Sequence, residues 1–176
     1  QTYRNEEFGF ELKYPEDWFN NTNEEANRKY QELGSSYIFS NQNVKDFQKE
    51  FDITQKNSIV FFFPIHKNDE HARSLFNTLK ALQAGEDFVE VQNVTNKRIT
   101  YTKTQDEVIA GMPAIRYIFE GGKVDFSQGL FPRLDVVLMF KNEMSFTFSL
   151  HGGSMEFVEQ HKEIFDQILS TFRFVP

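Results

Sequence analysis

The sequence predicts an α+β fold in which an antiparallel sheet carries helices on both faces, an α/β/α sandwich. Three observations support this prediction. Most apolar segments alternate with a period of two, as strands with one buried face do. Ser58–Phe63 shows no such alternation, so it predicts a central strand that is covered on both faces and ends at Pro64. The segments around Leu75 and Ile164 repeat their apolar residues at helical spacing.

The first predicted elements are a hairpin and a polar stretch. Phe8–Tyr14 alternates apolar and polar residues and predicts a strand that pairs with Thr2–Asn5. Trp18 follows as a large anchor near the end of this hairpin. The segment 19–57 is the most polar part of the chain, and we expect it to be rich in helix, with a short strand at Tyr37–Ser40.

The remaining elements are a helix, a series of strands and a closing helix. The first helix begins at Asn68 or Asp69 and ends near Gly85, where a glycine suits the left-handed cap. The closing helix begins near Ser154 and carries His161 on its apolar stripe. The predicted strands are Phe88–Val94, Arg98–Thr104, Glu107–Ala110, Ala114–Glu120, Leu134–Lys141, Met144–Leu150 and Phe172–Phe174.

Composition limits the class of protein. The 176 residues suit a single domain spanning 1–176, and the 21 Phe residues exclude an intrinsically disordered chain. The formal net charge of −7 argues against nucleic acid as a partner. There is no cysteine, so no disulfide and no thiolate metal site can form. The longest apolar run, Ile59–Phe63, is too short to span a membrane.

Chemistry-bearing motifs are scarce. No nucleophile elbow, phosphate-binding loop or zinc-protease motif is present, so we expect no catalytic residue, no resident cofactor and no enzyme. His66, Asp69 and His71 are the candidate ligands of a divalent metal, because they flank the junction between a strand and a helix. Asp69 and Glu70 are equally explained as acidic residues in the first turn of that helix.

Three linked segments carry a family pattern. Phe8–Trp18 ends in Tyr14-Pro15-x-x-Trp18, Ile109–Tyr117 contains Gly111-Met112-Pro113-Ala114, and Ile164–Phe174 joins a helix to a short strand. In this order and spacing they resemble the PsbP-like family, including its bacterial exported and lipoprotein members. The polar segment 19–57 departs from the short bacterial pattern.

The resemblance implies a fold and a general role. The fold is the α/β/α sandwich, and the role is exported and non-enzymatic. Plant members assist an oxygen-evolving photosynthetic complex, and a structurally similar nuclear protein binds the small GTPase Ran, so the fold does not choose the partner. We expect a protein partner at the cell envelope. Export is also favoured by the first residue, Gln1, and a lipid anchor upstream of residue 1 would suit the lipoprotein members.

Two further expectations concern binding. Phe47, Phe51, Phe126 and Phe131 lie in less regular segments, so they are the candidate residues for an exposed partner-binding patch, whereas the other Phe residues suit the core. The alternative function is a small-molecule or divalent-metal-binding protein that uses a cleft beside the sheet.

Overall fold

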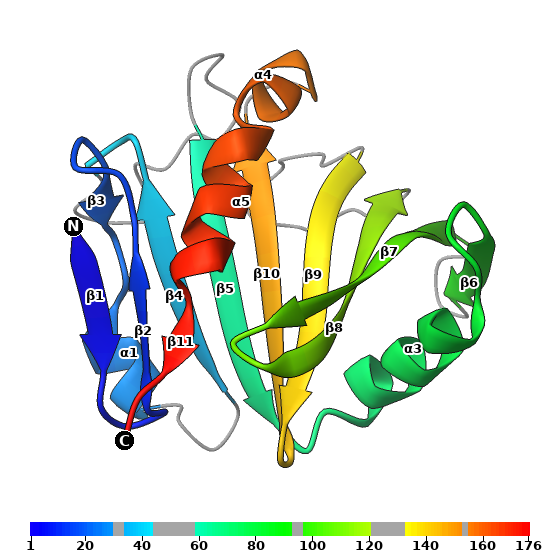
Figure 1. The fold of residues 1–176 in the computed structure, drawn as a ribbon, viewed down its shortest axis with the longest axis horizontal. Coiled ribbons are helices and arrows are strands. Elements are labelled where there is room, and N and C mark those ends of the chain that lie inside the picture. Colours follow the sequence, from blue (N-terminus) through cyan, green and yellow to red (C-terminus); the bar gives the residue numbers. More distant parts are fainter. Residues whose placement is uncertain (30–33, 44–58, 93–96, 121–132, 153–154) are drawn as a thin grey trace.

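The computed structural model describes residues 1–29, 34–43, 59–92, 97–120, 133–152 and 155–176 (Figure 1). Its strands form an eight-stranded sheet in the order β3-β4-β5-β10-β9-β8-β7-β6 and a three-stranded sheet in the order β1-β2-β11. Neighbouring strands are antiparallel throughout. The elements are β1 (Thr2–Asn5), β2 (Phe10–Lys13), β3 (Phe19–Asn20), α1 (Glu24–Lys29), β4 (Ser35–Ser40), β5 (Ile59–Lys67), α3 (Glu70–Ala81), β6 (Asp87–Gln92), β7 (Lys97–Ile109), β8 (Met112–Glu120), β9 (Arg133–Lys141), β10 (Met144–Gly152), α4 (Met155–Gln160), α5 (Lys162–Thr171) and β11 (Arg173–Phe174).

Strand β5 is the central strand that the sequence predicts. It lies between β4 and β10, and Val60 and Phe61, which point to opposite faces, are both buried. The sequence predicts that this strand ends at Pro64, but in the structure it continues to Lys67. In the pairing of β5 with β10, the residue pairs between Phe146↔Ile65 and Ser149↔Phe62 are absent. Proline has no N–H to donate, so the pairing is lost locally. The strand itself continues beyond this point.

Alternate residues of the large sheet enter two different cores. In β9, Val137 and Met139 belong to a first cluster, while Val136 and Leu138 belong to a second. The α+β prediction is therefore confirmed. The first cluster is completed by α5 and the three-stranded sheet, through side chains that include Phe165, Phe172 and Phe10, and the second by α3, through Ala72, Leu75 and Leu79.

The three-stranded sheet is a separate layer that the sequence did not predict. β11 pairs with β2, so the last residues of the chain extend the opening hairpin. In Figure 1 this small sheet and α5 lie on the same side of the large sheet. Helix α5 contacts both β2 and β10, and it therefore joins the two sheets.

Phenylalanine dominates the first cluster. Phe63 and Phe148 stack with ring centroids 4.5 Å apart, and Phe172 packs edge-on against both of them. Such aromatic pairs add about 0.5–1.5 kcal/mol each beyond the area that they bury. The abundance of Phe is thus largely a property of packing, as expected. Phe19 of β3 is an exception, because it is 41% exposed, and Phe62 is half-buried on the other face of β5.

Two further predicted boundaries are wrong. The predicted strands Arg98–Thr104 and Glu107–Ala110 form one strand, β7, whose register shifts between Lys103 and Gln105. Lys103 at this bulge is buried, and its Nζ donates to the Leu82 carbonyl at 2.8 Å and pairs with Asp106 at 3.0 Å. The predicted closing helix is likewise two helices, α4 and α5, which meet at His161.

Candidate functional site

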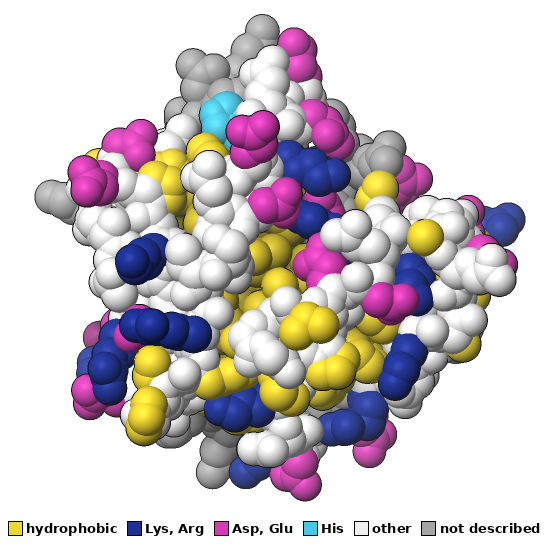
Figure 2. Space-filling model, in the orientation of Figure 1, with side chains coloured by type: hydrophobic (Ala, Val, Ile, Leu, Met, Phe, Trp, Pro, Cys, Tyr) yellow, Lys and Arg dark blue, Asp and Glu magenta, His cyan; other side chains and the backbone are white. Residues whose placement is uncertain are grey.

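The end of the β7–β8 hairpin is exposed and apolar. Val108 is 72% exposed, more than any other large hydrophobic residue in the described ranges. Pro113 lies directly opposite it in β8 and is also exposed. Figure 2 shows hydrophobic side chains gathered in the middle of this face, over the end of the hairpin. We call Val108, Ala110 and Pro113 the hairpin tip.

The opposite side of the same hairpin is anchored in the core. Ile109 is buried in the first cluster, and Met112, its partner across the hairpin, packs against that cluster. Because successive strand residues alternate between faces, Val108 and Pro113 then face solvent. The hairpin thus presents an apolar outer surface on a firmly packed base.

The turn itself is strained. Ala110 and Gly111 connect the strands, with φ values of 51° and 78°. Two consecutive residues with positive φ are typical of a type I′ hairpin turn, for which Asn-Gly is the favoured pair. Alanine has no side chain that compensates the left-handed conformation, so this position costs stability.

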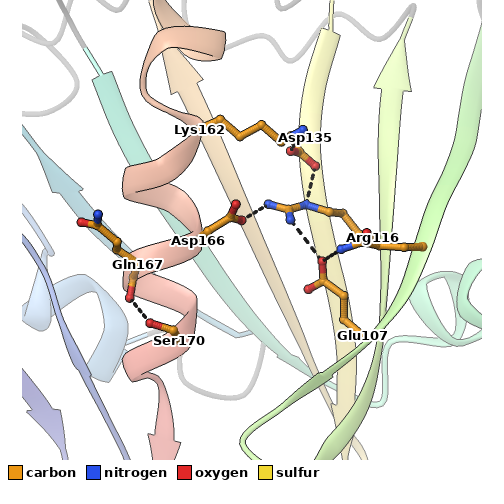
Figure 3. A network of polar contacts seen from close by, with 8 residues as sticks. Glu107, Arg116, Asp135, Lys162, Asp166, Gln167 and Ser170 are labelled. Carbon is orange, nitrogen blue, oxygen red and sulfur yellow. Dashed lines mark hydrogen bonds and ion pairs between the residues drawn. The ribbon is translucent and has the colours of Figure 1, made fainter.

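A buried arginine ties the hairpin to the rest of the molecule. Arg116 of β8 is only 6% exposed, and its guanidinium contacts three carboxylates (Figure 3). Nε lies 3.0 Å from Asp135 of β9, Nη1 lies 3.1 Å from Glu107 of β7, and Nη2 donates to Asp166 of α5. One side chain therefore connects two neighbouring strands and a helix.

The charges around Arg116 are arranged to keep it ionised. Burial alone would lower the pKa of Arg116, but the hydrogen bond to Asp166 and the charges of Asp135 and Glu107 raise this pKa above its ordinary value. Lys162 Nζ lies 3.6 Å from the second oxygen of Asp135. The guanidinium also lies 5.1 Å from the ring centroid of Phe165, a favourable cation–π position.

The predicted metal ligands are not brought together. Asp69 accepts a hydrogen bond from the Ala72 amide at 2.9 Å and caps α3. His71 is exposed and its Nε2 lies 3.9 Å from Glu90, while His66 lies in β5 against Gly34. No group of three His, Cys, Asp or Glu residues in the described part of the chain could hold a metal ion. The helix-cap interpretation of Asp69 is the one that the structure supports.

The predicted aromatic patch lies outside the described residues. Phe47 and Phe51 fall in 44–58, and Phe126 and Phe131 fall in 121–132.

A pocket of about 230 Å³ is present between the end of β2 and α5. It is open to solvent, and Lys13 is the only ionisable residue that lines it apart from a tyrosine. Its volume is below the usual range of small-molecule sites, about 300–1,000 Å³. None of its lining residues belongs to the segment 19–57, beside which a ligand cleft would suit the alternative function. It is lined by Lys13, Tyr14, Pro15, Ile164, Gln167, Ile168 and Thr171.

His151 lies in strand β10 rather than in the turn that its position before two glycines suggests. Its Nε2 is 2.7 Å from the hydroxyl of Ser149, and both residues are buried. The Ser149 hydroxyl also lies 3.3 Å from the Phe62 carbonyl, to which it donates. Burial lowers the pKa of His151 to about 4, so this residue is neutral at pH 7.

Sequence reasoning missed the Arg116 network and the hairpin tip. Glu107 is the first residue of a predicted strand, but the structure places it inside β7, where it pairs with the buried Arg116. The sequence signal for the Arg116 network is that Arg116 is a single basic residue within the otherwise apolar strand Ala114–Phe119. A charge buried in such a strand needs a partner. A second signal was the apolar composition of Val108–Pro113, where a hairpin turn is normally polar.

Comparisons with known proteins give one structural neighbour to report. No protein-family model matches the chain, and no curated protein matches it. Among solved structures, the chain is similar to the solution structure of cyanobacterial PsbP (CyanoP) from Synechocystis sp. PCC 6803. The two share 13% identity over 99% of this chain and 91% of that chain, with a TM-score of 0.47. Because identity and TM-score are both low, membership of the PsbP-like family stays a proposal.

The helices provide one further finding. In the part of the chain that the structure describes, none is both long and apolar enough to cross a membrane.

The strain at the turn leads to a first prediction. Replacing Ala110 with Asn should raise the free energy of unfolding by about 1 kcal/mol, because Asn tolerates positive φ. Gly111→Ala should lower the free energy of unfolding by about 1 kcal/mol, because alanine disfavours a positive φ. Steric contact is not the cause, since a Cβ there meets nothing within 4 Å. Urea denaturation monitored by circular dichroism measures both. Equal stability of the wild type and both variants would refute a strained type I′ turn.

The buried histidine leads to a second prediction. His151 stays neutral in the folded protein down to about pH 4, whereas in the unfolded chain it takes up a proton below about pH 6.5. This residue therefore adds no pH dependence above about pH 6.5, and it lowers the free energy of unfolding as the pH falls from there to about 4. The expected loss between pH 7 and pH 5 is about 2 kcal/mol.

Urea denaturation at the two pH values tests this assignment. The variant His151→Gln should lose about 2 kcal/mol less than the wild type between pH 7 and pH 5. The exposed His71 is the matched control, and His71→Gln should keep the wild-type loss. If His151→Gln and the wild type lose the same stability, His151 is not the group that titrates.

Proposed function

We propose that this chain is a non-enzymatic, exported domain of the PsbP-like type that binds a protein partner, or aids an assembly, at the cell envelope. The hairpin tip is the proposed contact. The observation that carries this proposal is the exposure of Val108 and Pro113 on a hairpin whose other face is anchored in the core.

The placement of the family-like segments supports the PsbP-like assignment. In the family pattern the opening hairpin ends in a Tyr-Pro-x-x-Trp block. Here Tyr14 and Pro15 follow directly after β2, the second strand of that hairpin. The Gly111-Met112-Pro113-Ala114 segment lies at the turn between two paired strands, and the last helix leads into β11. Each of these positions is consistent with what the resemblance implies, and the α/β/α arrangement is part of the same proposal. The exported location rests on the resemblance to exported members.

The hairpin tip has the physical features of a binding surface. Exposed apolar side chains on a rigid element favour association, because the contact removes apolar surface from water and little order has to be gained. The packing of Ile109 and the ion pair between Glu107 and Arg116 hold the base of the hairpin in place. Ala110 occupies a position where asparagine is expected to be more stable, so stability alone does not explain the alanine.

A capture experiment with matched variants tests the proposed function. The tagged protein is incubated with an envelope extract of the organism that encodes it, and the bound proteins are identified by mass spectrometry. We expect a specific partner to be retained by the wild type and lost by Val108→Lys, because a lysine at the centre of an apolar contact has to be desolvated.

The control is Phe19→Lys, which places the same charge on an exposed phenylalanine of β3, outside the hairpin. This variant should retain the partner at the wild-type level. Circular dichroism and thermal unfolding should show that both variants are folded. Equal capture by the wild type and by Val108→Lys would contradict the proposed role of the hairpin tip.

A further inference from the structure

Strand β6 is an edge of the large sheet. Among the described residues it pairs only with β7, and in Figure 1 it lies at the end of the sheet remote from β3. Alternate backbone N–H and C=O groups of an edge strand point away from the sheet and are available to a further strand. Six residues are enough for such pairing, since typical strands have about 5–6.

The side chains of β6 do not protect this edge. Val89 is 38% exposed and Val91 is 52% exposed, and they share one face of the strand. Natural edges are usually guarded by lysine, proline or a bulge, and β6 has no lysine and no proline. Its register with β7 is continuous from Asp87 to Gln92, so no bulge twists it away.

The charges of β6 are all negative. Asp87 and Glu90 are its only ionisable residues, and Asp87 shares the face of Val89 and Val91. Glu90 points to the other face, where the Tyr101 hydroxyl donates to it at 3.0 Å. A residue directly opposite Glu90 on an added strand would lie about 5 Å away, within reach of this carboxylate.

We propose that β6 accepts an extended segment of a partner protein as an additional antiparallel strand, with apolar residues opposite Val89 and Val91 and a lysine or arginine opposite Glu90. Main-chain hydrogen bonds would supply the affinity, and the valine pairs and the Glu90 ion pair would select the sequence. This surface is separate from the hairpin tip, and the inference does not rest on the proposed function.

A second copy of this chain fits the edge less well. Antiparallel pairing centred on Glu90 brings Val89 opposite Val91 of the other copy, but it also places two Glu90 carboxylates opposite each other. Pairing centred on Val89 instead places Asp87 opposite Val91. Like charges directly opposite each other destabilise a strand pair, so a basic partner strand is favoured over self-association.

The test uses the full chain labelled with ¹⁵N and a capped synthetic peptide, Thr-Val-Lys-Val-Thr. We expect saturable changes of the Phe88–Val91 amide shifts in NMR spectra, together with slower hydrogen exchange of the outward-facing amides. The peptide Thr-Val-Glu-Val-Thr should bind about 3- to 10-fold more weakly, because it opposes Glu90 with a like charge. The lysine peptide with alternate N-methylated residues should not bind, since it lacks the donors.

Matched protein variants separate this inference from the proposed function. The double variant Val89→Lys/Val91→Lys should lose peptide binding, whereas Val108→Lys at the hairpin tip should keep it. Three results would overturn the inference: no saturable shift change at β6, equal binding of the lysine and glutamate peptides, or self-association of the protein through β6 in place of peptide binding. Failure of partner capture by the hairpin tip would leave the peptide result unchanged, so the two failures are distinguishable.

Discussion

The guanidinium of Arg116 holds together the three strands β7, β8 and β9 and the helix α5. A charge this deeply buried is costly unless every donor direction is used, and Glu107, Asp135 and Asp166 supply acceptors from β7, β9 and α5. The three strands follow one another in the sequence, but Asp166 of α5 is separated from Arg116 by 50 residues. The ion-pair network therefore couples the hairpin to the closing helix, and a purely apolar contact would not fix their relative position as specifically.

As a consequence, the two sides of the hairpin have different environments. Inward, Ile109 and Met112 extend the phenylalanine-rich first cluster, whose rings pack between the large sheet, the small sheet and α5. Outward, Val108 and Pro113 are left to solvent. The same strands present alternate residues to α3 on their other face. An exposed apolar tip is tolerated because its base is fixed by packing and by charge.

Much of the fold was predictable from alternation and helical spacing. The strand β5, the helix α3 capped by Asp69 and the final strands β9 and β10 follow from local patterns. The patterns could not predict which distant elements meet: the pairing of β11 with β2 depends on tertiary contacts, and so does the meeting of Glu107 with Asp166 at Arg116. The candidate aromatic residues lie in segments outside the described residues, whereas the exposed Val108 lies on a regular hairpin. Asp69, one of the three predicted metal ligands, caps its own helix by accepting a hydrogen bond from the Ala72 amide.

The most direct test of the Arg116 network is amide hydrogen exchange on Arg116→Leu, compared with the wild type and with Arg4→Leu. Arg4 pairs at 4.0 Å with Glu6 at an exposed site, so its removal should change little. In Arg116→Leu, the amides of Val108–Met112 should exchange at least about 10-fold faster relative to those of β5, because the hairpin has lost its tie to α5. An unchanged ratio between the hairpin and β5 amides would contradict the account.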